Sequence, residues 1–159
     1  MANCYKKNQP TTRNMETQTP KNKKIALDYW KSLWETRDLN KVRDHLADNV
    51  SYHAPRMEMH GKQNYLELVQ SYLSVFEDTH LIFEDQIAEG DKVVTRVTFS
   101  GIFKGAFGDI QPTGEKVTFK LINILQFLNG RIINEWEVYD ELGLMQQIGM
   151  ELVHKEHAH

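Results

Sequence analysis

The sequence is poor in cysteine, in long apolar runs and in clustered basic charge. Its single cysteine, Cys4, can form no internal disulfide and offers no metal-site spacing. No segment is long and apolar enough to cross a membrane, and no hydrophobic stretch follows the N-terminal lysines as a secretory signal requires. The net charge is −3, and no basic run occurs outside the N-terminal segment, so nucleic-acid binding is not indicated. We therefore expect a cytoplasmic protein.

The nine glycines also lack a phosphate-binding pattern. Gly105, Gly108 and Gly114 have neither the Walker spacing nor the dinucleotide spacing. An alternating strand pattern follows them, so no helix N-terminus is available to hold an anion. This excludes nucleotide binding. The sequence also shows no Ser-His-Asp or Cys-His arrangement for nucleophilic catalysis.

The length of 159 residues suits one domain. Residues 1–19 are polar and bury too little apolar surface to offset the entropy of ordering, so we expect a flexible N-terminal tail. Residues 20–150 form the predicted domain, and residues 151–159 form a C-terminal tail. Three of the seven histidines lie in that last segment, and we do not interpret them as a metal site.

Helical spacing dominates the first half of the chain. Thr19 and Pro20 are typical of an N-cap followed by proline in the first turn, and Trp30 lies on the apolar face of the helix that follows. Asp38 can cap a short second helix, and a third apolar helical pattern runs from Tyr65 to Phe76. Between the last two helices, Val50 to Ala54 is a short strand candidate, followed by a loop over 55–61.

After Phe76 the apolar period changes to two, which indicates strands. Alternation marks three strands over 93–102, 116–128 and 131–140, and Asn129-Gly130 predicts a tight hairpin between the last two. Helices precede antiparallel strands, so we predict an α+β fold with helices on one side of a bent sheet. The three strands are apolar on both faces, and only one face can meet the helices. The second apolar face needs a cover of its own, so we predict that two copies of the chain form a homodimer through it.

Acidic side chains on the last strand are the main candidates for chemistry. Glu135 and Glu137 share one face of this strand, and a carboxylate buried there would gain a raised pKa and could carry protons near neutral pH. The alternative, which alternation alone favours, packs Ile132, Trp136 and Val138 into the core and leaves the acids in water. Asp140 ends the strand, where it is either a second catalytic candidate or the cap of a closing helix.

Four further residues are candidates for contact with a substrate. Asn123 falls on the apolar face of its strand, where a buried amide needs a partner, either a ligand or the backbone. Tyr52 and His53 are adjacent on the first strand, so one of them faces inward. Trp30 is typical of a core position and is also kept as a candidate for lining a pocket.

Several short motifs, taken together, resemble the SnoaL-like polyketide cyclases of the nuclear-transport-factor-2-like superfamily. The resemblance covers roughly Lys23 to Gly149. It rests on Ala88–Val93 (AEGDKV), Gly101 with Gly105, Gly108–Gly114 (GDIQPTG), Gly130–Ile133 (GRII), Glu135-Trp136 with Asp140, and Leu144–Gly149 (LMQQIG).

The resemblance implies a cone of curved antiparallel sheet around a long helix, with an apolar pocket inside. It also implies an intramolecular aldol cyclisation without metal or cofactor, in which a pocket carboxylate moves the proton. Glu137 matches that acid/base position, with glutamate in place of the family's aspartate. Asn123 matches the family's partner histidine, and Tyr52 or His53 matches its pocket asparagine. This match favours the inner face for Glu137, against the alternation.

Two relatives of this fold serve as alternatives. Epoxide hydrolases carry an Arg-x-Asp pair on one strand, and no strand here shows it. Ketosteroid isomerases place an aspartate base on the first strand, where this chain has Ala54 beside His53. The sequence therefore predicts a lyase or isomerase that acts on a hydrophobic carbonyl compound. A non-catalytic binder of hydrophobic ligands, or a dimeric interaction module, remains the alternative of a different class.

Overall fold

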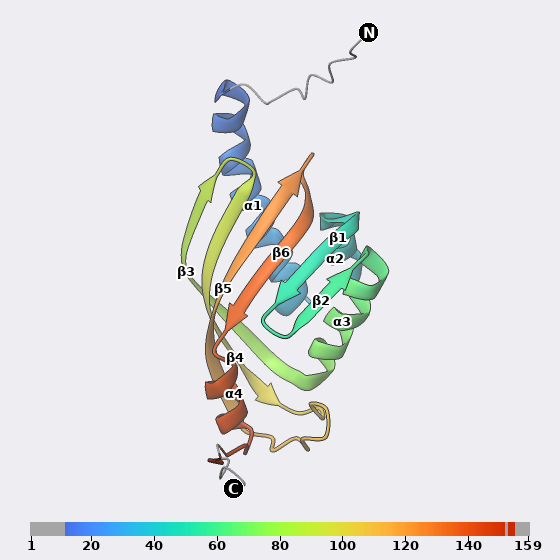
Figure 1. The fold of residues 1–159 in the computed structure, drawn as a ribbon, viewed down its shortest axis with the longest axis vertical. Coiled ribbons are helices and arrows are strands. Elements are labelled where there is room, and N and C mark those ends of the chain that lie inside the picture. Colours follow the sequence, from blue (N-terminus) through green and yellow to red (C-terminus); the bar gives the residue numbers. More distant parts are fainter. Residues whose placement is uncertain (1–11, 152, 155–159) are drawn as a thin grey trace, which may run out of the picture.

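A computed structural model describes residues 12–151, 153 and 154. Most of the predicted C-terminal tail and residues 1–11 of the predicted N-terminal tail lie outside this part. Within it, a curved sheet packs against helices (Figure 1). The helices are α1 (Thr12–Trp34), α2 (Leu39–His45), α3 (Lys62–Val75) and α4 (Glu141–Gln147). The strands are β1 (Leu46–Ala54), β2 (Met57–His60), β3 (Phe76–Glu89), β4 (Lys92–Phe103), β5 (Lys116–Leu128) and β6 (Arg131–Tyr139).

The six strands form one sheet in the order β2-β1-β6-β5-β4-β3. Neighbouring strands are antiparallel except β1 and β6, which run parallel. The predicted α+β fold is confirmed. β1 begins at Leu46, earlier than expected, and a tight turn at Pro55-Arg56 adds β2 where the sequence predicted only a loop. None of the helices in the described part of the chain is long and apolar enough to span a bilayer.

Helix α1 begins well before its predicted start. It runs from Thr12, so Thr19 is not its N-cap and Pro20 lies inside the helix. Proline removes one backbone hydrogen bond, but its fixed φ is compatible with a helix, so the chain before it can still be helical. In Figure 1 this first part of α1 projects past the end of the sheet. The predicted boundary was therefore too late.

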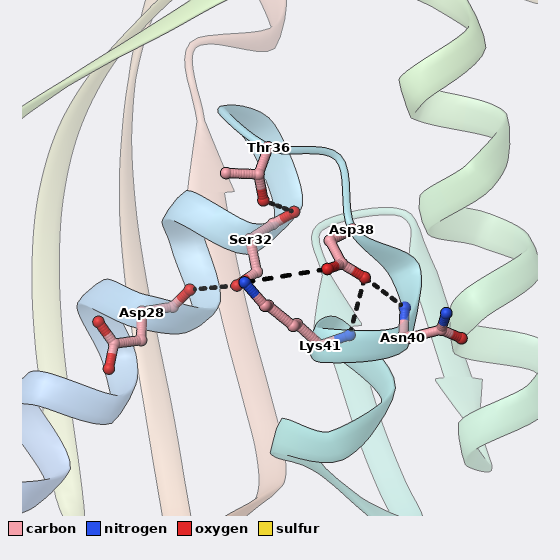
Figure 2. Close-up of polar contacts among 6 residues, drawn as sticks. All are labelled: Asp28, Ser32, Thr36, Asp38, Asn40 and Lys41. Carbon is pink, nitrogen blue, oxygen red and sulfur yellow. Dashed lines mark hydrogen bonds and ion pairs between the residues drawn. The ribbon is translucent and has the colours of Figure 1, made fainter.

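Local polar contacts set the junction between α1 and α2 (Figure 2). The Asp38 carboxylate accepts hydrogen bonds from the backbone N–H groups of Asn40 at 3.1 Å and Lys41 at 3.2 Å, as the predicted cap requires. The backbone N–H of Asp38 in turn donates to the carbonyl of Ser32, 2.9 Å away. These bonds turn the chain so that α2 can lead directly into β1.

The core lies between α1 and the inner face of the sheet. Helix α1 packs against β3 and β4, and α3 packs against β1. On β4, the alternating residues Val93, Val97, Phe99 and Phe103 are fully buried, as the period of two predicted. The hairpin between β5 and β6 turns at Asn129 and Gly130, which have φ values of 51° and 75°, a conformation that tight hairpin turns require.

Gly105 fixes the loop between β4 and β5. A Cβ atom added at Gly105 would lie 2.0 Å from the carbonyl oxygen of Ser74, so only glycine fits there. Its backbone N–H donates to the carbonyl of Val75 at the end of α3, 3.0 Å away. This close approach holds the loop against α3, and Phe107 follows two positions later.

Candidate functional site

A β-bulge on β6 decides which side chains face the interior. The pairing of β5 with β6 matches Leu125 to Glu135 but Phe127 to Ile132, so β6 contains one extra residue between these pairs. The alternation therefore changes phase within β6, and both Ile132 and Glu135 point inward. The sequence alternative that left the acids in water is wrong for this reason. Trp136 and Val138 lie on the outer face instead.

Glu135 is buried with only 1 % of its surface exposed, and it is fully engaged in hydrogen bonds. Asn123 Nδ2 donates to Oε1 of Glu135 at 2.6 Å. Tyr65 donates to Oε2, and the Tyr29 hydroxyl lies 3.0 Å from the same oxygen and also hydrogen-bonds to Tyr65. Each phenol has one hydrogen, so Tyr29 divides its donation between the two. Three donors from α1, α3 and β5 thus converge on this carboxylate.

Glu137 is half-buried, and Tyr52 donates a 3.2 Å hydrogen bond to its Oε1. Burial, and then the charge of Glu135 next to it, raises the pKa of Glu137 from 4.5 to about 8. Burial also raises the pKa of Glu135, but its hydrogen bonds from Tyr65, Tyr29 and Asn123 oppose the rise. The richer donor set favours the charge on Glu135, so at neutral pH the pair holds one proton, mainly on Glu137.

The tyrosines remain neutral donors around these two carboxyls. Burial and the nearby Glu135 raise the pKa of Tyr29 and of Tyr65 well above the usual 10. Burial and the charge of Glu137 raise the pKa of Tyr52 in the same direction, and burial raises that of Tyr72 to about 12. None of the four phenols can therefore supply a phenolate at physiological pH.

Three neighbouring cavities lie near Glu137 and share several lining residues. Two inner cavities of about 30 and 50 Å³ share Trp30, Trp34, Tyr72 and Glu137 in their linings. The rest of the larger one is aromatic and aliphatic: Phe76, Phe99, Phe107, Phe119, Leu121, Tyr139 and Leu144. An outer cavity of about 200 Å³ shares Tyr72, Phe107 and Tyr139 with it, and the ion-paired Arg56 and Glu141 also line this outer cavity. The Glu137 carboxyl thus belongs to the lining of both inner cavities, next to a mainly apolar surface.

The structure brings together three of the predicted site residues with Glu137. Tyr52 and Trp30 line the inner cavities beside it, and Asn123 lies directly across from it in the β5–β6 register. Asn123 is fully buried and is not among the residues that line the described cavities. Its amide therefore holds Glu135 and does not face a ligand, which changes the role predicted for it.

Two predicted residues lie elsewhere. His53 faces outward, where its ring stacks on Trp136 at 5.4 Å and its Nδ1 lies 3.5 Å from Glu58. Because Tyr52 takes the inward direction, strand alternation sends His53 to the other face. Asp140 is exposed and accepts a 2.9 Å hydrogen bond from the backbone N–H of Gly143, so it is the cap of α4. The structure gives Asp140 no place in the cavity.

Sequence reasoning did not select Tyr29, Tyr65, Trp34 or Tyr72. Their helical spacing indicated only that they face the core. Nothing in the sequence pairs α1 or α3 with a particular residue of β6. The described residues also contain no group of three or more His, Cys, Asp or Glu side chains that could hold a metal ion.

The fold and its inner cavity place the molecule among the proteins with a ketosteroid isomerase-like fold. One solved structure of that description, from Catenulispora acidiphila, is 16 % identical, covers 80 % of this chain and 93 % of its own, and has a TM-score of 0.67. The chain belongs to the SnoaL-like polyketide cyclase family, whose sequence profile matches residues 24–148.

Other solved structures have a similar fold. AclR from Streptomyces galilaeus is 25 % identical, with 82 % of this chain and 97 % of its own covered and a TM-score of 0.75. A SnoaL-like protein from Jannaschia sp. CCS1 is 18 % identical, with coverages of 84 % and 95 % and a TM-score of 0.78. No curated protein matches the sequence significantly.

Proposed function

We propose that this protein is a cofactor-independent cyclase or isomerase that acts on a hydrophobic carbonyl compound, with Glu137 as the proton carrier. One observation carries the proposal: a half-buried carboxyl with a pKa raised to about 8 lines an inner cavity whose other lining residues are aromatic or aliphatic. A pKa near the working pH allows a carboxyl both to take and to return a proton. Membership of the polyketide cyclase family supports this reaction class.

The reaction begins with the ionised form of Glu137. Its carboxylate takes a proton from the carbon next to the substrate carbonyl, and the electron pair of the broken C–H bond moves to the carbonyl oxygen as an enolate. In a cyclisation, the enolate carbon then forms a bond to a second carbonyl carbon of the same molecule. The resulting alkoxide takes the proton back from Glu137. In an isomerisation, Glu137 returns the proton to a different carbon.

Tyr52 and Glu135 set the properties of Glu137 in this scheme. The Tyr52 hydroxyl fixes the orientation of the carboxyl, and its hydrogen bond leaves Oε2 of Glu137 for the substrate. Burial, and then the charge of Glu135, raises the pKa of Glu137 so that it keeps a proton at neutral pH. The volumes of the inner cavities are smaller than the volume of a usual ligand pocket, which is roughly 300–1,000 Å³. A polycyclic ligand therefore enters only when aromatic side chains such as Phe107 and Tyr72 rotate.

Solvent deuterium exchange tests the proposal directly. Bicyclic and polycyclic ketones and β-keto esters are incubated with the protein in D₂O, and NMR follows deuterium incorporation at the α-carbon above the uncatalysed rate. We expect exchange for at least one compound that also raises the melting temperature. A compound that raises the melting temperature without exchange would favour the ligand-binding alternative. No stabilisation by any of these compounds would overturn the pocket assignment and favour an interaction module.

We also propose that two copies of the chain associate through the outer face of the sheet. Ile122 and Val138 are directly paired across β5 and β6, and they are 49 % and 63 % exposed. Ile82 and Leu128 add further exposed apolar surface to the sheet, and such surface usually marks an interface. Light scattering at micromolar concentration should give the mass of a dimer.

Val138→Lys should reduce that mass to the mass of a monomer, because a charge in an apolar interface loses its hydration. The matched control is Leu142→Lys, since Leu142 is half exposed but lies on helix α4 and not on a strand of the sheet. A monomeric mass for the unaltered protein would rule the interface out.

A further inference from the structure

Two tryptophans that line the inner cavities have unpaired hydrogen-bond donors. Trp30 and Trp34 lie one helical turn apart on α1, and both line the two inner cavities together with Glu137. The Nε1 atoms of both indoles are buried, and neither has a hydrogen-bond partner within the described part of the chain. Trp30 has only 1 % of its surface exposed. These are the same cavities that the proposed proton carrier lines.

A buried donor without an acceptor weakens a folded protein, and phenylalanine would fill similar space without that cost. Here the cost occurs twice within one turn of one helix. No described residue accepts a hydrogen bond from either indole, and the larger cavity is lined mainly by aromatic and aliphatic side chains. An indole N–H can only donate, so whatever satisfies it must supply an acceptor. An oxygen atom of a bound ligand meets this requirement.

We propose that the indole N–H groups of Trp30 and Trp34 donate hydrogen bonds to a carbonyl oxygen of a ligand bound in the cavities that Glu137 also lines. The ligand class is then an aromatic or alicyclic ketone whose ring lies among the aromatic side chains and whose oxygen meets α1. This inference rests on the proposed function. When Glu137 removes the α-proton, negative charge develops on that oxygen, and preorganised donors bind the enolate more strongly than the ketone.

Binding of a matched ligand pair tests the proposal without any need for turnover. The probes are 1-tetralone and tetralin, which share their ring skeleton and differ in the carbonyl oxygen. Titration calorimetry measures both dissociation constants for the unaltered protein, Trp30→Phe and Trp34→Phe. We expect each substitution to weaken 1-tetralone binding by about 5- to 10-fold, the equivalent of one lost hydrogen bond, while tetralin binding is unchanged. Trp136→Phe is the matched control, because Trp136 lies on the outer face against His53.

Indole resonances give a second measurement in the same samples. In ¹⁵N–¹H spectra, the Trp30 and Trp34 indole signals should move downfield when 1-tetralone binds but not when tetralin binds, and the Trp136 signal should stay in place. Trp34 meets the ring of Phe99 edge-to-face at 4.8 Å, and an N–H held by that ring would not move. The inference would be overturned if the Trp30 and Trp34 signals did not move, or if each substitution weakened the binding of both probes equally. It would also be overturned if the unaltered protein bound 1-tetralone no more tightly than tetralin.

The outcome separates this inference from the proposed function. Repeating the titration in Glu137→Gln removes proton transfer but leaves both indoles in place, so the ketone preference should persist. If deuterium exchange occurs but the Trp30 and Trp34 indole signals do not move, Glu137 is still the proton carrier and the two indoles have no part in the mechanism. If the indole signals move but no deuterium exchange occurs, the two indoles bind the ketone and the protein is a ketone-binding protein without this activity.

Discussion

Glutamine in place of Glu137 is expected to lower the rate of α-proton exchange, or of ring closure, by about 10²–10⁴-fold, the usual contribution of one general acid/base. Glutamine has nearly the same shape as glutamate but cannot accept the substrate proton. Tyr52 can still donate to the amide oxygen, so the cavity should keep its form and KM should change little. The measurement is kcat and KM for any ketone found by deuterium exchange. Glu89→Gln is the matched control, because Glu89 is exposed at the far end of β3.

The same substitution should change how stability depends on pH. The pKa of Glu137 is raised in the folded state, so its stabilising contribution is complete below pH 4.5 and is lost as the pH rises through about 8. In this window the free energy of unfolding should fall by at most about 1.4 kcal/mol per pH unit on account of this group. Denaturant titrations at pH 5.5 and 7.5 should show a smaller fall for Glu137→Gln. If the free energy of unfolding fell equally with pH in the unaltered protein and in Glu137→Gln, or if the variant kept full activity, Glu137 would not be the proton carrier. Glu135 would then be the next residue to test.

Alanine in place of Glu135 should reduce the free energy of unfolding by about 3–5 kcal/mol, as expected when one partner of a buried polar network is deleted. The change leaves Tyr29, Tyr65 and Asn123 without their shared acceptor, and it also opens a cavity in the buried core. Asn123 already has one unpaired buried atom, its Oδ1, so the amide would lose its remaining bond. Urea denaturation at a fixed pH measures the difference.

Glu135→Gln is the matched variant for this second prediction. It keeps the size of the side chain and one acceptor oxygen but removes the charge, so it should destabilise the fold less than alanine. Because the charge of Glu135 helps to raise the pKa of Glu137, this variant should also lower that pKa, measured by carbon NMR of the carboxyl groups. A loss below about 1 kcal/mol for Glu135→Ala, within the range of an ordinary surface change, would show that the network does not hold the core together.

The pattern of apolar residues was enough to predict most of the helices and strands in their order, but not β2. The alternation on β4 and the turn at Asn129-Gly130 depend on neighbours in sequence, and the structure agrees with both. The same holds for the Asp38 and Asp140 caps, since a cap is a contact within a few residues of chain. Glu137 was identified through the family resemblance, and alternation alone pointed the other way.

What the sequence by itself determined is therefore local: the class of fold, the positions of most elements, the family and the carboxyl that matches its proton carrier. Only the tertiary structure decided which face of β6 is buried, because the bulge that changes its phase depends on the pairing with β5. The same is true of the partners of Glu135, which come from α1, α3 and β5, up to 106 positions away. Contacts across such separations follow from packing of whole elements, and no short sequence pattern records them.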